Sequence, residues 1–258
     1  MENNKVLKGL YPITPSLYKS DIDYLSRIRS VLKSGINVFQ FRSKFLSFRR
    51  KKFLLKSISN ICNDNNVKLI INDDYNLGKL FDIKGLHIGR NDRDLISARK
   101  YFGKEFIIGK SCYNSIELAK YSMDNNASYV SFGAMYPTKS KASAIIVKHS
   151  ILIEAKKIIK IPICVIGGIN KSNIKSLIKY KPDMVSMISG IFNSNEIDET
   201  INIDDLLNLI INKFLYKKDL YLKTNLPYLI EIFFKKKINY FTSKDKIYYF
   251  YKYFLLKV

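Results

Sequence analysis

The sequence predicts an α/β fold: a single (β/α)8 TIM barrel followed by a basic, aromatic-rich C-terminal extension. Short apolar runs alternate with longer segments of helical spacing almost from end to end, and eight strand–helix units follow one another in series. Residues 5–215 also have the length that such a barrel needs. Residues 216–258 break this rhythm, and we expect this extension to be helical or partly disordered.

The expected strands are short apolar runs bounded by polar or turn-forming residues. Such runs are typical of strands that are buried on both faces of a parallel sheet. In chain order they are Leu10–Thr14, Val38–Arg42, Lys68–Asn72, Gly85–Ile88, Phe106–Gly109, Tyr129–Phe132, Ile163–Ile166 and Met184–Ile188.

The segments between these strands carry apolar residues three and four positions apart. This spacing predicts helices that pack one face against the sheet. In chain order they are Asp21–Lys33, Ser47–Cys62, Tyr75–Phe81, Asp92–Tyr101, Ser115–Met123, Lys148–Ile158 and Lys171–Lys179, with a further helix expected at Ile203–Leu215.

The composition favours a soluble, cytoplasmic protein. No apolar run approaches the roughly 18 to 20 residues needed to cross a bilayer, and no charged-then-apolar leader precedes Lys5. Three cysteines, Cys62, Cys112 and Cys164, are far apart and sit in or beside apolar segments. We therefore expect reduced, mostly buried thiols rather than a disulfide framework or a zinc site.

The chain is strongly basic, with 44 Lys and Arg against 22 Asp and Glu and a formal net charge of +22. Such a charge is typical of proteins that bind nucleic acids. However, lysine is spread along the whole chain together with abundant Ile, Asn, Tyr and Phe, a set that AT-rich codons encode. Codon bias explains the basicity at least as well as a polyanionic partner, so no specific nucleic-acid partner is expected. An extension that binds RNA or a membrane surface is the alternative.

The second expected strand carries a polar face. Period-two alternation puts Gln40, Arg42 and Lys44 on one side and Phe39 and Phe41 on the other. In a barrel the phenylalanines would face the helices, so the polar side chains would point inward and toward the mouth. Two cations there need an anion. An edge strand with a solvated polar face is the alternative, but the surrounding βαβ pattern argues against exposed edges.

Carboxylates follow the third and fourth expected strands. The third ends in Asn72-Asp73-Asp74, and the fourth leads through Gly89 to Asp92. The carboxyl ends of neighbouring parallel strands meet where α/β enzymes hold metals and phosphates. Asp73 and Asp92 are therefore predicted to share one Mg2+, which prefers one or two carboxylates with phosphate oxygens and water. We expect Asn72 to act as an active-site amide and Asp74 to cap the next helix.

The loops after the last three expected strands suit phosphate groups. Residues 133–141 include two hydroxyls and two ammonium groups in four positions, Thr138, Lys139, Ser140 and Lys141. The seventh strand ends in Gly167-Gly168-Ile169, and the eighth ends in Ile188-Ser189-Gly190. Backbone N–H groups of the loops after strands seven and eight are the common phosphate cradle of this barrel class.

In combination, these segments resemble the thiamine phosphate synthase family in order and spacing. The resemblance covers about residues 7–195 and is specific only as a set. The matching segments are Gln40-x-Arg42-x-Lys44, Asn72-Asp73-Asp74, His87-Ile88-Gly89 followed by Asp92, Gly109-Lys110-Ser111, Pro137-Thr138-Lys139-Ser140-Lys141, Gly167-Gly168-Ile169 and Ile188-Ser189. The resemblance implies a transferase that joins hydroxymethylpyrimidine pyrophosphate to a thiazole phosphate, giving thiamine phosphate and pyrophosphate.

The resemblance also implies a role for each matching residue, with Mg2+ held by Asp73 and Asp92. Contacts with the pyrimidine pyrophosphate are implied for Gln40, Arg42, Lys44 and Asn72. Hydrogen bonds to the departing pyrophosphate are implied for Ser111 and Lys141, so the catalytic set would be Asn72, Ser111 and Lys141. Binding of the thiazole phosphate is implied for Thr138, Ser140, Gly168, Ile188 and Ser189.

The chemistry that the family implies is a dissociative substitution. The pyrimidine C–O bond can break before attack because the aminopyrimidine ring spreads the developing positive charge. The protein must then stabilise the leaving pyrophosphate and hold the thiazole nitrogen in line. No general base is needed, so the presence of only two histidines is no objection. We expect His87, on a buried strand, to be structural and His149 to lie at the surface.

The chain departs from the family pattern at a few positions. Arg90-Asn91 stands where the family more often has Gln or Arg followed by Glu, Ser140 replaces a more usual Thr, and Lys139 adds a cation. None of these changes removes a catalytic group. The alternatives are a thiazole tautomerase of the same superfamily and a non-catalytic basic barrel associated with RNA or a membrane. Small-molecule substrates are the expected partners, and the chain could form a homo-oligomer.

Overall fold

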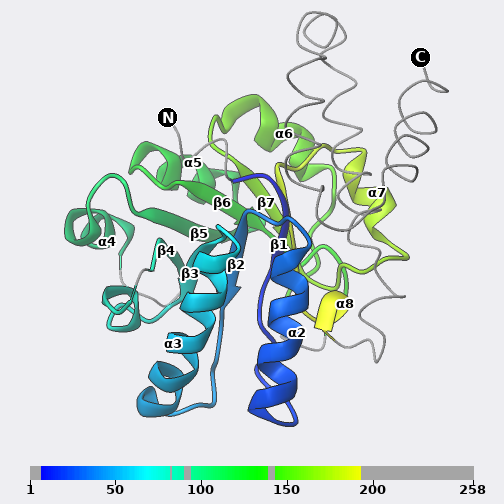
Figure 1. Ribbon diagram of the computed structural model, residues 1–258. Coiled ribbons are helices and arrows are strands. Elements are labelled where there is room, and N and C mark those ends of the chain that lie inside the picture. Colours follow the sequence, from blue (N-terminus) through cyan, green and yellow to red (C-terminus); the bar gives the residue numbers. More distant parts are fainter. Residues whose placement is uncertain (1–6, 82, 90–93, 139–142, 193–258) are drawn as a thin grey trace, which may run out of the picture. The chain divides into compact units, whose positions relative to one another are not determined.

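The computed structural model describes residues 7–81, 83–89, 94–138 and 143–192 (Figure 1). Eight parallel strands form a nearly closed barrel with helices between them, which confirms the predicted (β/α)8 fold. The predicted domain boundary at residue 215, the expected helix Ile203–Leu215 and the extension 216–258 lie outside the described residues.

The strands agree closely with the apolar runs of the sequence. They are β1 (Gly9–Pro12), β2 (Val38–Phe41), β3 (Lys68–Asn72), β4 (Gly85–Ile88), β5 (Ile107–Tyr113), β6 (Tyr129–Phe132), β7 (Ile163–Ile166) and β8 (Met184–Met187). Their order in the sheet is β1-β8-β7-β6-β5-β4-β3-β2, and each neighbouring pair in this order is parallel. Parallel strands in sequence order around a barrel all point their carboxyl ends to the same mouth.

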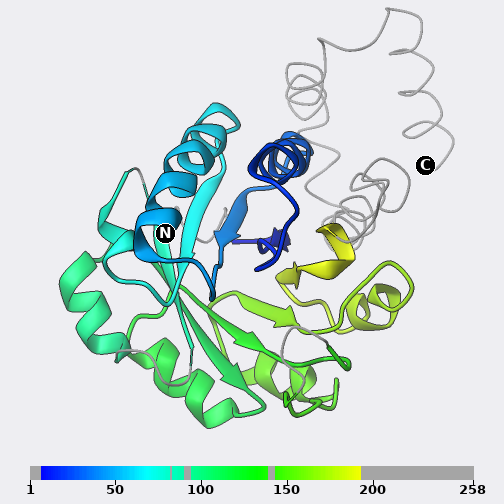
Figure 2. The same ribbon diagram turned by 90° about the horizontal axis from the view of Figure 1, so that it is seen from below.

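The helices lie around the outside of the strands, as the view from below shows (Figure 2). They are α2 (Asp21–Lys33), α3 (Phe48–Asp64), α4 (Leu95–Phe102), α5 (Ile116–Asp124), α6 (Ile151–Ile158), α7 (Ile174–Ile178) and α8 (Ser189–Phe192). Four of them begin after a side chain that accepts a hydrogen bond from a backbone N–H of the first turn: Ser20, Ser47, Asp94 and Ser115. Such N-caps explain why these helices start where they do.

Three local expectations were wrong. The segment Tyr75–Phe81 forms only a single 3-10 turn, η1 (Leu77–Lys79), rather than a helix. Strand β5 continues to Tyr113, well past the expected end at Gly109, and its register shifts between Ser111 and Tyr113. His149 is half-buried rather than at the surface, because its ring packs against Tyr136 and Tyr180; its Nε2 also lies 3.0 Å from the carbonyl oxygen of Met135.

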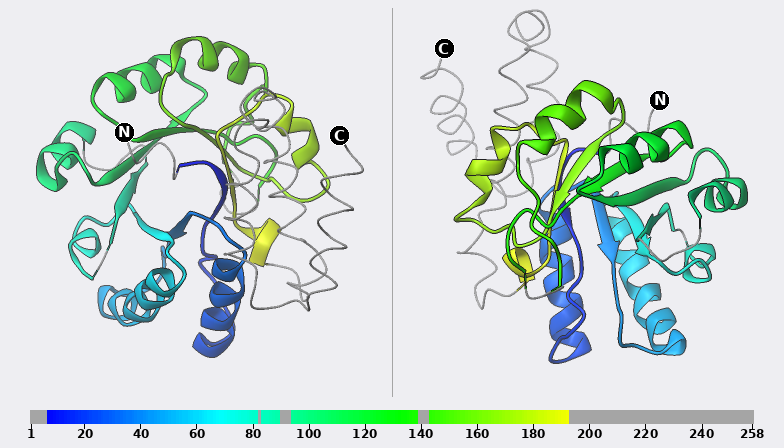
Figure 3. Two further views of the ribbon diagram at one scale, coloured as in Figure 1. Left: turned by 45° about the horizontal axis from the view of Figure 1, so that its top comes forward. Right: turned by 180° about the vertical axis from the view of Figure 1, so that it is seen from behind.

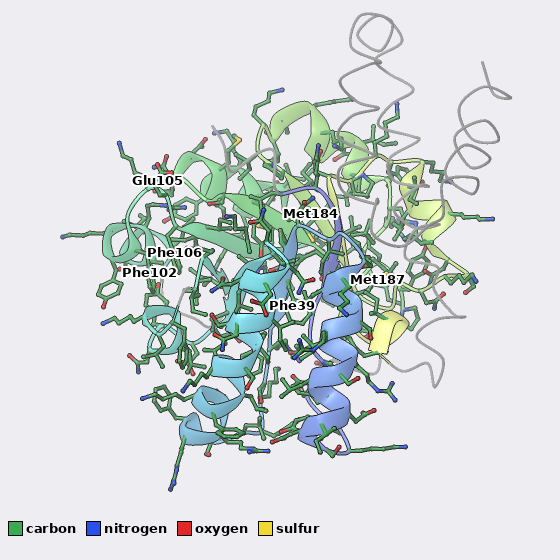
Figure 4. All side chains as sticks on the ribbon, in the orientation of Figure 1. Phe39, Phe102, Glu105, Phe106, Met184 and Met187 are labelled. Carbon is green, nitrogen blue, oxygen red and sulfur yellow. The ribbon has the colours of Figure 1, made fainter. Side chains whose placement is uncertain are left out.

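Two apolar clusters build the core, one on each side of the sheet. The inner cluster fills the barrel and consists of Leu7, Tyr11, Val38, Ile70, Ile107, Tyr129, Cys164 and Met184. The larger outer cluster lies between the strands and the helices and includes Phe39 and Phe41, as their alternation with Gln40 predicts. Met184 of the inner cluster and Phe39 of the outer one are labelled in Figure 4.

The barrel closes between β1 and β2 through a short seam. Ile13 and Gln40 form an isolated parallel bridge, and the backbone N–H of Thr14 donates to the carbonyl of Gln40 at 3.0 Å. The buried Thr14 hydroxyl accepts from the N–H of Arg42 at 2.8 Å and donates to the Arg42 carbonyl at 3.0 Å. One side chain therefore satisfies both backbone groups of the residue that follows β2.

The three cysteines are free and buried, as expected. Burial raises the pKa of Cys62 to about 12 and that of Cys112 to about 12, so both thiols stay protonated near neutral pH. Burial also raises the pKa of Cys164. Among the described helices, none is long and apolar enough to span a membrane.

Replacing Thr14 tests the seam. Thr14→Val keeps the side-chain shape but leaves two backbone groups of Arg42 without their hydroxyl partner. We expect the free energy of unfolding, measured by urea denaturation, to fall by about 1 to 3 kcal/mol. Thr14→Ser keeps the hydroxyl and should lose less. An equal or greater loss in the Ser variant would show that the methyl group, and not the hydrogen bonds, stabilises the seam.

Candidate active site

The described residues predicted to form the site lie within six strands or follow their carboxyl ends, and parallel strands bring these ends to one mouth of the barrel. Figure 3 shows the strands of this barrel from two further directions. These residues are Gln40, Arg42, Lys44, Asn72, Asp73, Ser111, Thr138, Gly168, Ile188 and Ser189. Asp92, Ser140 and Lys141 lie outside the described residues, as do Arg90, Asn91 and Lys139.

Gln40 points into the barrel from β2. It is 1% exposed, and its amide nitrogen donates to the hydroxyl of Tyr11 at 2.7 Å. Its amide oxygen is buried and has no hydrogen-bond partner in the protein. A buried polar atom without a partner is costly and rare in a folded protein. An arriving group that donates a hydrogen bond would satisfy it.

Arg42 lies half-buried at the start of the loop after β2. Its guanidinium donates to the hydroxyl of Ser16 at 3.2 Å. Burial lowers the pKa of Arg42, and the nearby Asp73 carboxylate opposes this effect. A guanidinium remains charged in proteins, so a fixed positive charge faces the mouth. Lys44, two residues further on, is exposed.

Asp73 and Asp74 have different surroundings although they are adjacent. Asp73 has a left-handed backbone with φ 63°, donates its N–H to the carbonyl of His87 at 2.9 Å, and accepts from the side-chain amide of Asn72. Non-glycine residues in this conformation often occur at functional sites. The Asp74 carboxylate instead accepts from the backbone N–H of Leu77 at 3.2 Å and pairs with Lys51 at 3.3 Å. Asp74 thus bonds the first N–H of the 3-10 turn η1, but the helix that it was predicted to cap is absent and Asn76 is the residue that precedes the turn.

A pocket of about 570 Å³ opens beside these acids. It is lined by Ser43, Lys44, Lys51, Asn72, Asp73, Asp74, Tyr75 and Asn76. The hydroxyl of Ser43 is buried without a hydrogen-bond partner in the protein. The pocket thus combines ammonium, carboxylate, amide and hydroxyl groups, and it suits a small polar ligand that carries phosphate.

The metal prediction is only partly covered by the described residues. Among them, no three His, Cys, Asp or Glu side chains gather as a metal-binding group. Asp73 is described and Asp92 is not. An exposed carboxylate beside an amide and a polar pocket is nevertheless compatible with Mg2+, because this ion takes few protein ligands and completes its shell with phosphate and water.

Ser111 is held by His87 inside the barrel. The His87 Nε2 and the Ser111 hydroxyl oxygen are 2.8 Å apart, and the His87 Nδ1 lies 2.8 Å from the hydroxyl of Tyr129. Neighbouring Lys110 faces the other side of β5 and donates to the carbonyl of Gly89 at 2.6 Å. His87 thus lies on a buried strand, as expected, and its partner Ser111 is a predicted catalytic residue.

The loops after β6, β7 and β8 approach one another closely. A Cβ added at Gly168, where φ is +64°, would lie 2.3 Å from the carbonyl oxygen of Pro137. Only glycine allows this contact between the loops that carry Thr138 and Gly168. Ile188 directly follows β8, and its carbonyl accepts from the N–H groups of Ile191 and Phe192 in α8. Backbone groups here are close enough to form one binding surface.

Sequence reasoning missed three side chains of the site: Tyr11, Tyr129 and Ser43. Tyr11 and Tyr129 lie on strands, so period-two alternation could have predicted that both point inward. Their pairing could not, because the two tyrosines are 118 residues apart in the chain.

Comparisons with known proteins agree with this geometry. Residues 10–191 match the family model described as "Thiamine monophosphate synthase". The thiamine-phosphate synthase of Pelagibacter ubique is 39% identical over 198 residues, which cover 76% of this chain and 95% of that protein. The thiamine-phosphate synthase of Thioalkalivibrio sulfidiphilus is 34% identical over 191 residues, which cover 74% of this chain and 90% of that protein.

Solved structures share the fold. A thiamine phosphate pyrophosphorylase from Pyrococcus furiosus superposes with a TM-score of 0.72 at 24% identity, covering 83% of this chain and 99% of that one. A 3-hexulose-6-phosphate synthase from Salmonella typhimurium superposes with a TM-score of 0.59 at 15% identity, covering 80% of this chain and 99% of that one. Barrels of this shape thus carry different reactions.

Different substitutions should separate the roles of the two adjacent acids. Asp74→Ala removes the acceptor for the Leu77 N–H and the partner of Lys51, so the free energy of unfolding should fall by about 1 kcal/mol. Asp73→Asn keeps side-chain volume and should change it by less than about 0.5 kcal/mol. Chemical denaturation of both variants gives the comparison. Equal destabilisation would mean that Asp73 is also part of the structural turn.

Proposed function

The chain belongs to the thiamine monophosphate synthase family, and from this premise we propose which residues at the barrel mouth carry out the reaction. The protein is a transferase, a thiamine phosphate synthase, that transfers the pyrimidine group. It joins hydroxymethylpyrimidine pyrophosphate to the thiazole phosphate. The thiazole nitrogen lone pair forms the new C–N bond, and the C–O bond breaks with release of pyrophosphate.

The observation that carries the proposal is the buried, unpartnered amide oxygen of Gln40. The exocyclic amine of an aminopyrimidine is a donor that would satisfy it. Arg42 lies two residues further along the same strand direction, where its charge would face the pyrophosphate of the same substrate. The spacing of these two side chains thus fits a ligand with an amine at one end and an anion at the other.

Catalysis in this proposal is positioning together with stabilisation of the leaving group. Arg42, Lys44 and Lys141 supply positive charge, and Ser111 donates a hydrogen bond to the departing pyrophosphate. Asn72 orients the Asp73 carboxylate, to which its amide is hydrogen-bonded. Asp73 and Asp92 would hold Mg2+. The ion, when bound, neutralises negative charge on the pyrophosphate oxygens.

The thiazole phosphate would bind on the other side of the mouth. Thr138 and Ser140 supply hydroxyl groups. Gly168 offers backbone groups where the loops after β6 and β7 come close together, and Ile188 and Ser189 offer theirs directly after β8. Because the thiazole nitrogen already carries a lone pair, no side chain has to remove a proton from the nucleophile. The binding groups alone must hold it in line with the breaking bond.

Several finer assignments belong to the proposal as well. We place the enzyme in the cytoplasm, with a catalytic domain over residues 5–215 and an extension over residues 216–258 that is not needed for chemistry. A thiazole tautomerase would not need the pyrophosphate and metal groups. The joint presence of Arg42, Lys141, Asp73 and Asp92 therefore favours the synthase.

The metal assignment predicts an activity that depends on a divalent cation. Purified protein with both substrates and Mg2+ should form thiamine phosphate, detected as fluorescent thiochrome after oxidation. Chelation should abolish turnover, and added Mg2+ should restore it. Asp73→Asn should lower kcat by about 100-fold or more, because it removes a charged ligand from the site of developing charge.

Asp74→Asn is the matched control. It changes the residue next to Asp73 in the same way, and an Asn side chain can still accept the hydrogen bond from the Leu77 N–H. It should keep most of the activity. Full turnover in metal-free buffer would refute the metal assignment. Absence of product under conditions in which a known synthase works would refute the function itself.

The charge assignment predicts a selective loss of binding. Arg42→Ala should weaken binding of the pyrimidine pyrophosphate by about 1.5 to 3 kcal/mol and that of the thiazole phosphate much less. Isothermal titration calorimetry with each substrate measures both effects. Arg49→Ala, which removes an exposed cation from α3, serves as the control. Unchanged pyrophosphate binding in Arg42→Ala would make Arg42 an ordinary surface cation.

A further inference from the structure

A continuous series of hydrogen-bonding groups crosses the inside of the barrel. It runs from the Gln40 amide to the Tyr11 hydroxyl at 2.7 Å, and from there to the Tyr129 hydroxyl at 2.9 Å. Tyr129 lies 2.8 Å from His87 Nδ1, and His87 Nε2 lies 2.8 Å from the Ser111 hydroxyl. We call these five side chains the barrel relay. Its two ends are residues that the proposed function assigns to opposite ends of one substrate.

The barrel relay is built into the core. Gln40, Tyr11, Tyr129 and His87 are all at most 8% exposed, and they come from four different strands, β2, β1, β6 and β4. A Cβ on Gly109 would lie 2.0 Å from the Tyr129 ring, so this glycine leaves the space that the ring occupies. Fixed, buried hydrogen bonds of this kind are strong and mutually polarising.

If both buried tyrosine hydroxyls donate as well as accept within the relay, the donors and acceptors allow two consistent directions along it. If the Gln40 amide nitrogen donates to Tyr11, then Tyr11 donates to Tyr129, Tyr129 donates to His87 Nδ1, and His87 Nε2–H donates to Ser111. The Ser111 hydrogen is then directed away from His87 and can meet an anion. If every bond is reversed, Ser111 donates to His87 and offers an anion only lone pairs.

Both ends of the substrate select the same direction. An amine that donates to the Gln40 amide oxygen holds the amide nitrogen toward Tyr11. A pyrophosphate oxygen at Ser111 requires the hydroxyl hydrogen. One arrangement of the relay meets both requirements. Binding of the amine at Gln40 therefore favours binding of pyrophosphate at Ser111, and the reverse also holds.

Resting on the proposed function, we propose that Tyr11, Tyr129 and His87 are positioning residues that couple recognition of the aminopyrimidine at Gln40 to hydrogen-bond donation by Ser111 to the pyrophosphate. The relay sets the orientation of hydroxyl groups and moves no net charge. Burial, the largest effect, raises the pKa of Tyr11 and of Tyr129 above the ordinary value, so both phenols remain neutral and able to donate.

The histidine tautomer gives a direct test that needs no turnover. The chain has only two histidines, so 15N-histidine NMR spectra are simple, and a His149→Asn variant assigns the two rings. With hydroxymethylpyrimidine added, His87 should be the neutral Nε2–H tautomer. Tyr129→Phe removes the hydrogen bond to His87 Nδ1 and should therefore change the 15N chemical shift of that nitrogen. A His87 ring in the Nδ1–H tautomer with the pyrimidine bound would overturn the proposal.

Ligand coupling gives the second test. Affinity for inorganic pyrophosphate with Mg2+, measured by calorimetry, should rise about fivefold to tenfold when hydroxymethylpyrimidine is present. Tyr129→Phe should reduce this ratio to about one, whereas a merely structural role would weaken both ligands and leave the ratio unchanged. Tyr180→Phe, a partly buried tyrosine outside the relay, should keep the ratio.

Together with the activity assay, these two experiments distinguish failure of this inference from failure of the proposed function. If the parent protein makes no thiamine phosphate, the function fails, and the histidine spectra still decide the direction of the relay. If the parent is active but the coupling ratio persists in Tyr129→Phe, the function stands and the relay is wrong. An additive loss of kcat in the Ser111→Ala/Tyr129→Phe double variant would also contradict it, because Tyr129 is inferred to act through Ser111.

Discussion

Closure of the sheet between β1 and β2 is the constraint on which the rest of the structure depends. The two strands share one isolated bridge, and the Thr14 hydroxyl completes the seam by bonding both backbone groups of Arg42. Gln40 and Arg42 lie on the β2 side of this seam. The hydrogen bonds that close the barrel therefore also fix the backbone of two side chains proposed to bind the pyrimidine substrate.

A closed parallel barrel has to fill its interior, and this chain fills it in two ways. Val38, Ile70, Ile107 and Met184 provide apolar packing, as is usual for the fold. Nearer the mouth, buried polar side chains replace the apolar ones. Such groups are tolerated only when they are hydrogen-bonded, and the barrel relay satisfies them in turn, except for the amide oxygen of Gln40. The Gln40 amide oxygen in the relay and the Ser43 hydroxyl outside it therefore mark places where a ligand would complete the hydrogen bonding of the site.

Overall shape does not decide what this barrel does. The fold is shared with a 3-hexulose-6-phosphate synthase at a TM-score of 0.59, whereas the synthase relatives match at 34% and 39% identity over most of their length. Nor does the net charge of +22 identify a partner, because lysine is spread along the whole chain. Function follows from particular side chains at the mouth, and most of these lie in or after strands whose geometry the fold dictates.

The sequence by itself determined the barrel, because the alternation of apolar strands and amphipathic helices is a local property: β3, β4 and β7 begin and end at the residues that the pattern predicts. Period two also sufficed to turn Gln40 inward. The Asp74 side chain bonds the backbone of the next turn, but the pattern predicted a helix there and a single 3-10 turn forms instead. Local pattern failed at the end of β5, where a register shift depends on the partner strand. Only the tertiary structure decided that Tyr11 meets Tyr129, since contacts across 118 residues arise from barrel closure and leave no mark on either segment.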